Sequence, residues 1–93
     1  SSLADNSMYL SVWPNPFSDV LNIEFDLAAA GNVIVEITDM LGKKAYENVF
    51  SNQPAGNILL QINSSGLQMN TGIYNLKIIS GGVTSVIKCA YQK

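Results

Sequence analysis

The side chains that could carry chemistry in this chain of 93 residues are few and of limited kinds. There are seven acidic residues, five lysines and one cysteine, but no histidine and no arginine. Without histidine, the chain cannot form a Ser-His or Cys-His catalytic pair, and it cannot form a zinc site with imidazole ligands. The single cysteine, Cys89, cannot form a disulfide within the chain.

The carboxylates are scattered along the sequence rather than paired. Their spacing brings no two of them together for acid–base chemistry, and none belongs to a D-x-D-x-D-G calcium loop. We therefore expect that the chain is not an enzyme and that it has no catalytic, cofactor-binding or metal-binding residues. The acidic residues are Asp5, Asp19, Glu24, Asp26, Glu36, Asp39 and Glu47.

The charge and the apolar content narrow the class of protein further. The net charge is −2, so the chain lacks the clustered cations that binding to nucleic acid requires. The longest apolar stretches, such as Leu27–Ala30, have about four residues, whereas a membrane-spanning helix needs about 20. With 47% apolar and 13% charged residues, the chain is expected to fold as one small domain.

Apolar residues recur at every second position in several stretches of the sequence. We therefore expect strands, rather than helices, to position these side chains. Leu21, Ile23 and Phe25 alternate with polar residues, and similar runs begin at Val33 and Tyr74. Such alternation is typical of strands with one buried face. We predict strands at about Met8–Val12, Asp19–Leu27, Asn32–Asp39, Lys43–Phe50, Ile58–Asn63, Ile73–Ser80 and Val83–Gln92.

Seven short strands separated by turn residues predict an all-β fold, an immunoglobulin-like antiparallel β-sandwich. In Asp39–Lys43, the Asp39 carboxylate is expected to accept hydrogen bonds from backbone N–H groups two or three residues later, while Gly42 takes a positive φ. Ser80–Gly82 predicts a tight hairpin between the last two strands. Turn residues at Asn52–Gly56 and Ser64–Gly66 predict longer loops in which the chain changes sheets.

The domain is expected to occupy residues 8–93. Ser1–Ser7 is mostly small and polar, as in a linker from a parent protein. Because the sequence does not begin with Met, we expect it to be a piece of a longer chain.

Three local motifs stand out. The two prolines in Trp13–Phe17 predict a stiff, kinked segment, either a plain connector between strands or an exposed recognition surface. Gly72 is expected to let the backbone bend before a strand whose buried Tyr74 needs a partner for its hydroxyl. Cys89 shares the parity of Ile87 and Tyr91, which predicts an inert thiol on the buried face.

The order of the motifs along the chain is more specific than any one of them. A P-N-P element at Pro14–Pro16 is followed by a D-x-x-G-K turn at Asp39–Lys43. A G-x-Y strand then begins at Gly72–Tyr74, and the final strand contains Lys88. In this order, over nearly the whole chain, the motifs resemble the C-terminal sorting domain of the type IX (Por) secretion system of the Bacteroidota.

The resemblance implies that the chain is an address label rather than a catalyst. Such a domain ends a cargo protein and directs the cargo across the outer membrane through the type IX secretion machinery. A sortase-like cysteine peptidase then removes the domain, and the cargo is commonly attached to lipopolysaccharide. The implied partners are this machinery, the peptidase and an N-terminal cargo domain of the same chain. The implied route leads through the periplasm to the cell surface or the extracellular space, with cleavage in or before Ser1–Ser7.

The resemblance also implies which residues are recognised. The final strands carry most of the signal in this family, and the P-N-P element accompanies them. Trp13 stands where the family commonly has Tyr, which is another large amphipathic ring. The recognition candidates are Pro14, Asn15, Pro16, Gly72, Tyr74, Lys77, Lys88 and Lys93.

A C-terminal strand at a sheet edge suggests how recognition could work. Its unpaired backbone N–H and C=O groups could pair with a strand of a partner protein. Lys88 and Lys93 could discourage self-pairing at that edge while remaining available for recognition.

Two other functions fit a sandwich of this kind. A carbohydrate-binding or adhesive module would need a row of exposed aromatic side chains. A passive spacer like a fibronectin type III domain would need no site at all. The aromatic residues available for a carbohydrate site are Tyr9, Trp13, Tyr46, Phe50 and Tyr91.

Overall fold

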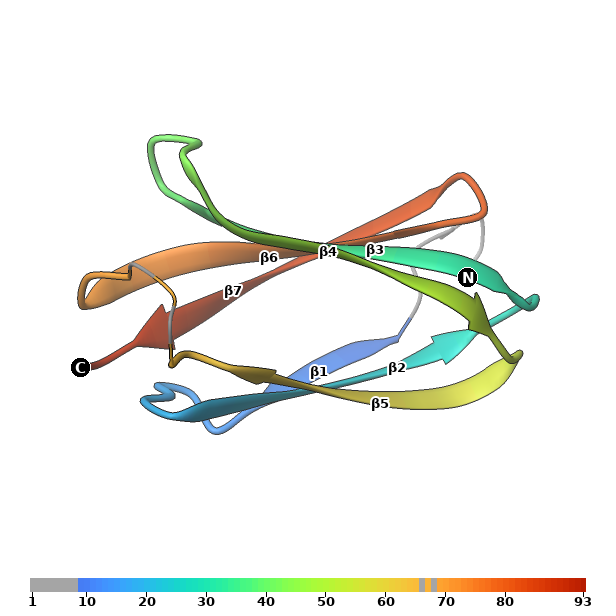
Figure 1. The fold of residues 1–93 in the computed structure, drawn as a ribbon, viewed down its shortest axis with the longest axis horizontal. Helices are drawn as coiled ribbons and strands as arrows, with labels where there is room; N and C mark the ends of the chain where they lie inside the picture. Colours follow the sequence, from blue (N-terminus) through green and yellow to red (C-terminus); the bar gives the residue numbers. More distant parts are fainter. Residues whose placement is uncertain (1–8, 66, 68) are drawn as a thin grey trace.

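The computed structural model describes residues 9–65, 67 and 69–93, and these residues form seven β-strands and no helix (Figure 1). This confirms the predicted all-β class. The predicted linker Ser1–Ser7, together with Met8 and Gly66, lies outside the described residues. The strands are β1 (Leu10–Trp13), β2 (Val20–Leu27), β3 (Gly31–Asp39), β4 (Lys44–Gln53), β5 (Gly56–Asn63), β6 (Gly72–Ser80) and β7 (Val83–Tyr91).

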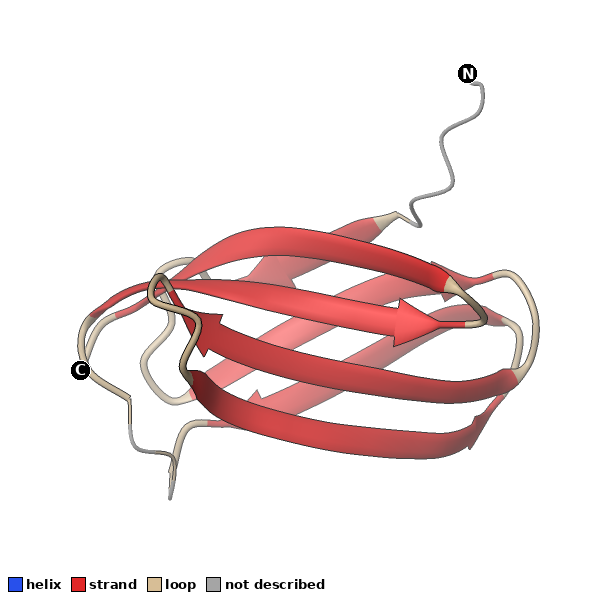
Figure 2. Cartoon of the chain, turned by 90° about the horizontal axis from the view of Figure 1, so that it is seen from above, coloured by secondary structure: helices blue, strands red, loops and turns tan. Residues whose placement is uncertain are grey.

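The strands form a sandwich of two antiparallel sheets. One sheet has the order β1-β2-β5 and the other β4-β3-β6-β7. Figure 2 shows the two layers one behind the other, with their strand directions turned relative to each other. The chain therefore crosses between sheets after β2, β4 and β5, and the last strand, β7, lies at an edge.

The predicted long loop at Asn52–Gly56 is wrong. β4 continues to Gln53 and β5 already begins at Gly56, so only Pro54 and Ala55 lie between them. Asn52 and Gly56 have positive φ angles of 58° and 114°, and these two residues turn the chain sharply enough to carry it into the other sheet. The change of sheet predicted here is confirmed, as is the change predicted after Asn63.

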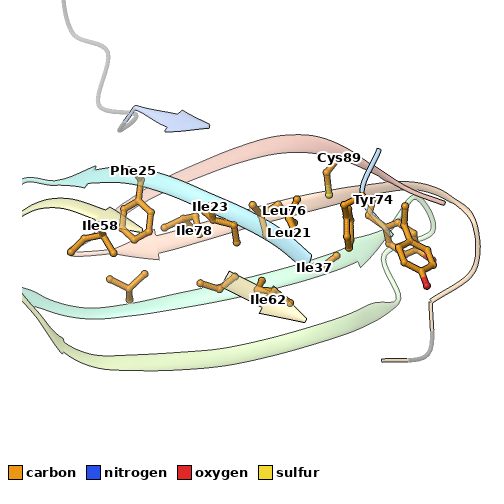
Figure 3. Close-up of a cluster of buried hydrophobic side chains, with 14 of the residues drawn as sticks. Leu21, Ile23, Phe25, Ile37, Ile58, Ile62, Tyr74, Leu76, Ile78 and Cys89 are labelled. Atoms are coloured by element: carbon orange, nitrogen blue, oxygen red, sulfur yellow. The ribbon is translucent and has the colours of Figure 1, made fainter. Parts of the chain in front are cut away.

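The core is a single layer of apolar side chains between the sheets (Figure 3). The strands contribute alternate residues to this layer, as the period-two pattern predicts. Leu21, Ile23 and Phe25 of β2 face Val35 and Ile37 of β3 across this layer. The buried apolar residues are Phe17, Leu21, Ile23, Phe25, Leu27, Val33, Val35, Ile37, Ile58, Ile62, Met69, Tyr74, Leu76, Ile78, Cys89 and Tyr91.

Two turns follow the predicted chemistry closely. The Asp39 carboxylate accepts hydrogen bonds from the backbone N–H groups of Leu41 (2.9 Å) and Lys43 (2.8 Å). These donors lie two and four residues after Asp39, where two or three were predicted. Gly42 has a φ of 88°, which a glycine adopts without steric cost. Between β6 and β7, Gly81 and Gly82 both have positive φ angles, as a two-residue hairpin turn requires.

The buried layer gives a direct test of the fold. Leu76→Ala removes a fully buried side chain and should lower the free energy of unfolding by about 2–5 kcal/mol. Leu59→Ala makes the same chemical change at a side chain that is 57% exposed, and it should change stability by less than about 0.5 kcal/mol. Denaturant melts of both variants measure the two values, and equal losses would contradict the assignment of the inner face.

Cys89 lies on the inner face of β7 with 1% of its surface exposed, which confirms the predicted parity. Burial raises the pKa of the Cys89 thiol from 9.0 to about 11. At pH 8 the folded protein therefore holds almost no thiolate, which is the reactive form.

Labelling of Cys89 by a thiol reagent should accordingly be slow in the native protein and fast in denaturant. The raised pKa also predicts a loss of stability at high pH. Between pH 9 and 11 the unfolded chain releases the thiol proton while the folded chain keeps it, so the free energy of unfolding decreases as the pH rises. Cys89→Ser lacks this titration and serves as the control. Rapid labelling of the folded protein at pH 8 would show that the thiol is accessible.

Candidate functional site

Three of the sequence motifs meet at one end of the sandwich. The strand register brings Trp13 beside Asn22, Asp39 beside Tyr74, and Gly72 beside Tyr91. The chain segments next to these residue pairs therefore lie at the same end of the sandwich, on the left in Figure 1. We call this region the C-terminal end of the sandwich; it comprises Pro14–Phe17, Asp39–Lys43, Met69–Gly72 and Gln92–Lys93.

The P-N-P element forms a strap along the outer edge of β7. After β1 the chain leaves the three-stranded sheet, and Phe17 forms a parallel bridge with Tyr91 of the other sheet. The Asn15 side chain accepts a hydrogen bond from the Ala90 backbone N–H at 2.8 Å. The Phe17 N–H donates to the Ala90 carbonyl, and the Gln92 N–H donates to the Phe17 carbonyl, both at 2.9 Å. We call Pro14–Phe17 the strap.

The strap is anchored by an aromatic contact as well as by hydrogen bonds. Phe17 is buried, and its ring centre lies 5.2 Å from that of Tyr91, with the two rings tilted by 58°. The prolines on either side of Asn15 have no backbone N–H. They are exposed, as is Asn15, so the strap presents an outer surface while its inner groups hold β7.

The strap corrects part of the expectation that the edge of β7 offers unpaired backbone groups. The outward N–H and C=O groups of Ala90 and the N–H of Gln92 are bonded to the strap. A partner strand could not pair with these groups unless the strap moved. The sequence could not reveal this, because the residues that meet are about 75 positions apart.

Tyr74 is an internal anchor. It is buried on the inner face of β6. Its hydroxyl donates to the Asn70 carbonyl at 2.7 Å and accepts from the Asn70 backbone N–H at 2.9 Å. The predicted need for a hydroxyl partner is thus confirmed. The Tyr74 side chain fixes the segment that leads into β6, and its burial leaves little of it to touch a partner.

The chain bends at Thr71, directly before β6, as predicted, but Gly72 does not adopt a conformation that only glycine favours. Its φ is not among the positive φ angles of the chain. A Cβ at this position would meet only the Asn70 carbonyl oxygen, at the ordinary contact distance of 3.9 Å. Neither the backbone conformation nor the available space therefore requires a glycine here.

The candidate lysines lie in two places. Lys77 and Lys88 are on the outer face of the four-stranded sheet, where Lys77 pairs across the strands with Val86 and Lys88 with Asn75. Lys88 is exposed and Lys77 is half-buried. Lys93 is at the C-terminal end, where its backbone N–H donates to the Thr71 hydroxyl at 3.1 Å.

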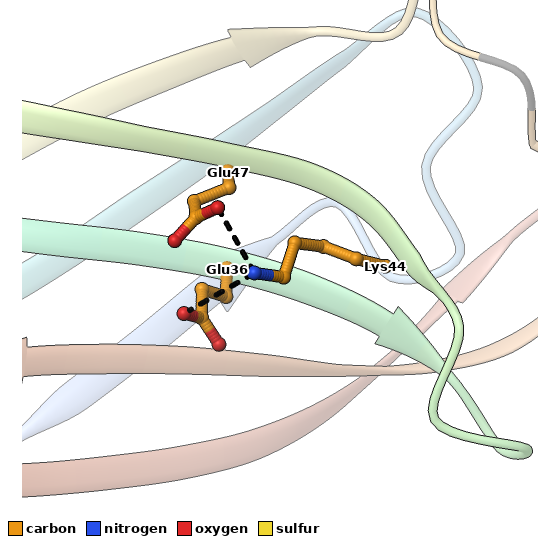
Figure 4. A network of polar contacts seen from close by, with 3 residues as sticks. All are labelled: Glu36, Lys44 and Glu47. Atoms are coloured by element: carbon orange, nitrogen blue, oxygen red, sulfur yellow. Dashed lines mark hydrogen bonds and ion pairs between the residues drawn. The ribbon is translucent and has the colours of Figure 1, made fainter.

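A charged network occupies the other half of that outer face (Figure 4). The Lys44 ammonium lies 2.9 Å from a Glu47 carboxylate oxygen and 3.9 Å from one of Glu36. The hydrogen bond with Glu47 raises the pKa of Lys44 and lowers that of Glu47. Lys44 and Glu47 are exposed, so the ion pair between them contributes little to stability.

Sequence reasoning missed the apolar tip of the β3–β4 turn. Met40 is 55% exposed and Leu41 is 95% exposed. The D-x-x-G-K motif located the turn, but it carried no sign that its two middle residues point into solvent. Beside this turn, at the mouth of the sandwich, is a hollow of about 420 Å³. It is lined by Lys43, Leu67, Met69, Asn70, Tyr91 and Lys93.

The aromatic side chains do not form a row. Tyr9 and Trp13 are exposed but lie at opposite ends of β1. Tyr46 and Phe50 are half-buried against the core, and Tyr91 is buried. The described residues therefore offer no flat aromatic surface of the kind that a carbohydrate module needs. They also contain no group of three or more His, Cys, Asp or Glu side chains that could hold a metal ion, and no helix that could span a membrane.

A family model describing the secretion system C-terminal sorting domain matches residues 11–91. The chain belongs to this family. The match covers β2 to β7, all of β1 except Leu10, the strap and the Asp39–Lys43 turn. A comparison with curated proteins found no match. The family is that of the type IX secretion signal, so membership implies export through the outer membrane and contact with the type IX secretion machinery.

The bond from Asn15 to β7 can be tested in the sorting domain directly. Asn15→Ala removes the acceptor for the Ala90 N–H and should lower the free energy of unfolding by about 0.5–1.5 kcal/mol. Hydrogen exchange of the Ala90 amide should become several-fold faster. Asn15→Asp keeps an acceptor oxygen at the same position and should preserve most of the protection. If Ala90 exchanges equally fast in all three proteins, the strap does not hold β7 through this bond.

Proposed function

We propose that this domain is the part of an exported cargo protein that the type IX secretion machinery recognises, and that it is removed once the cargo has crossed the outer membrane. A sortase-like cysteine peptidase would cut in or before Ser1–Ser7. The cargo would remain on the cell surface or be released outside the cell. The observation that carries the proposal is the family match, which spans nearly the complete fold.

The placement of the chain ends supports this role. β1 begins at Leu10, which pairs with Phe25, at the end of the sandwich opposite Lys93. A cargo domain attached before β1 would therefore leave the C-terminal end of the sandwich uncovered. The exposed strap residues Pro14–Pro16 and Lys93 lie at this end. A sorting label must remain accessible while it is joined to its cargo, and this arrangement meets that requirement.

The outer face of the four-stranded sheet supplies the remaining candidates. Lys88 is exposed there beside Asn75, and Lys77 lies diagonally across from it. We propose that the strap, Lys77, Lys88 and Lys93 contribute to recognition through their exposed groups. Tyr74 contributes indirectly, by holding the segment before Gly72 in place.

An export assay tests the proposal. The domain is fused behind a signal peptide and a reporter, in a host with type IX machinery, and should deliver the reporter to the surface or the medium. Deleting Val83–Lys93 should leave the reporter in the periplasm. That deletion also removes Cys89 and Tyr91 from the core, so loss of export alone could reflect unfolding.

Two gentler changes separate recognition from folding. Lys88→Ala alters an exposed charge and should change stability by less than about 0.5 kcal/mol. A short polar tail added after Lys93 alters only the terminus. At least one of them should impair export while the purified domain still melts cooperatively near the parent temperature. If both variants and the strand deletion export normally, the domain is a spacer.

A further inference from the structure

The outer face of the four-stranded sheet carries an exposed apolar patch next to the β3–β4 turn. Met40 and Leu41 form the tip of the turn, and Ile73 of β6 is 48% exposed on the neighbouring sheet surface. The Met40 sulfur lies 4.0 Å from the Asn75 side-chain nitrogen, so Met40 leans over β6 on the face from which Ile73 also projects. Ala90 of β7 pairs with Ile73 and extends the surface. We call Met40, Leu41, Ile73 and Ala90 the turn patch.

The tip of this patch is held in a defined conformation. The Asp39 carboxylate binds the backbone N–H groups on both sides of Gly42, those of Leu41 and Lys43. The Gly42 N–H donates to the Asp39 carbonyl at 3.0 Å, and the Asp39 N–H donates to the Lys43 carbonyl at 2.9 Å. A side chain on such a turn loses little backbone freedom when it binds, which lowers the entropic cost of forming an interface there.

Two lysines flank the turn patch. Lys43 follows the tip and Lys88 lies beside Asn75, and the described residues show no ion pair for either lysine. The carboxylate closest in sequence, Asp39, is already bonded to two backbone N–H groups. Glu36 and Glu47 are engaged by Lys44 further along the sheet.

The exposed apolar side chains and the two lysines favour one kind of binding partner for the turn patch over others. A second copy of the chain, docked by two-fold symmetry, would bring Lys43 and Lys88 close to their own counterparts, which is unfavourable. The net charge of −2 opposes adsorption to an anionic membrane surface. A protein surface with an apolar pocket and carboxylates at its rim complements both the apolar side chains and the two lysines.

We propose that the turn patch is a docking surface for a protein partner that receives Leu41 in an apolar pocket and pairs carboxylates with Lys43 and Lys88. This inference rests on the proposed function, because it places the contact with the export machinery on this face of the sandwich. It adds Met40, Leu41 and Ile73 to the recognition candidates, and it gives Lys88 a partner of defined charge.

The test uses the same reporter fusion and compares matched variants. Leu41→Asp should reduce export at least tenfold, because a carboxylate would enter an apolar pocket next to acidic groups. Leu59→Asp makes the same change at another exposed leucine, on the outer face of β5, and should export normally. Lys88→Glu should reduce export, while Lys88→Arg keeps the positive charge and should restore it. All variants are checked for cooperative melting.

A photo-crosslinking residue placed at position 41 should form an adduct with a protein of the outer membrane, and the same residue at position 59 should not. The adduct should weaken when Lys88→Glu is added. This readout requires proximity between the turn patch and the partner, which a merely destabilising change would not produce.

The outcomes distinguish the two claims. If the parent domain exports the reporter and Leu41→Asp exports it equally well, the docking surface is wrong and the sorting function stands. If the parent domain itself fails to export the reporter, both are wrong. The docking proposal is also overturned if the 93-residue chain floats with phosphatidylglycerol vesicles through Leu41. It is likewise overturned if the chain forms a dimer in sedimentation equilibrium that Leu41→Asp dissolves.

Discussion

The whole fold depends on one constraint, which is that two sheets must share a single layer of apolar side chains. Each strand can supply only alternate residues to that layer, so its remaining residues face solvent. In the four-stranded sheet this leaves a broad outer face on which Glu36, Lys77 and Lys88 are displayed. The same alternation that builds the core therefore decides which residues are available for recognition.

The strap covers part of the sheet edge that this architecture leaves exposed at β7. β7 is an edge strand, and an edge strand presents backbone groups that can pair indiscriminately. Asn15 and Phe17 occupy those groups near the end of the strand. Because the flanking prolines offer no N–H of their own, the strap does not become a new strand with a free edge. Its outer side, and the turn patch on the adjoining face, remain exposed to solvent.

The sequence was a good guide where structure follows from local patterns. The run from Leu21 to Phe25 specified an inward face, and the residues around Asp39 and Gly42 specified a turn, because both depend on near neighbours. It was a poor guide where residues distant in the chain meet. The bonds of Ala90 to the strap and the exposure of Leu41 depend on the assembled sandwich. The bend before β6 was predicted, but neither the φ of Gly72 nor the space around it requires a glycine there.

The strap also makes the edge of β7 depend on both ends of the domain. The bond between Asn15 and Ala90 joins residues from the two ends of the domain, so the segment after β1 has no edge to dock on until the final strand has been synthesised. A ribosome that stops before Ala90 releases a chain with an unpaired strap, an open core and an incomplete C-terminal end. Docking of the strap is therefore a late step in folding, because it requires that β7 is already in place.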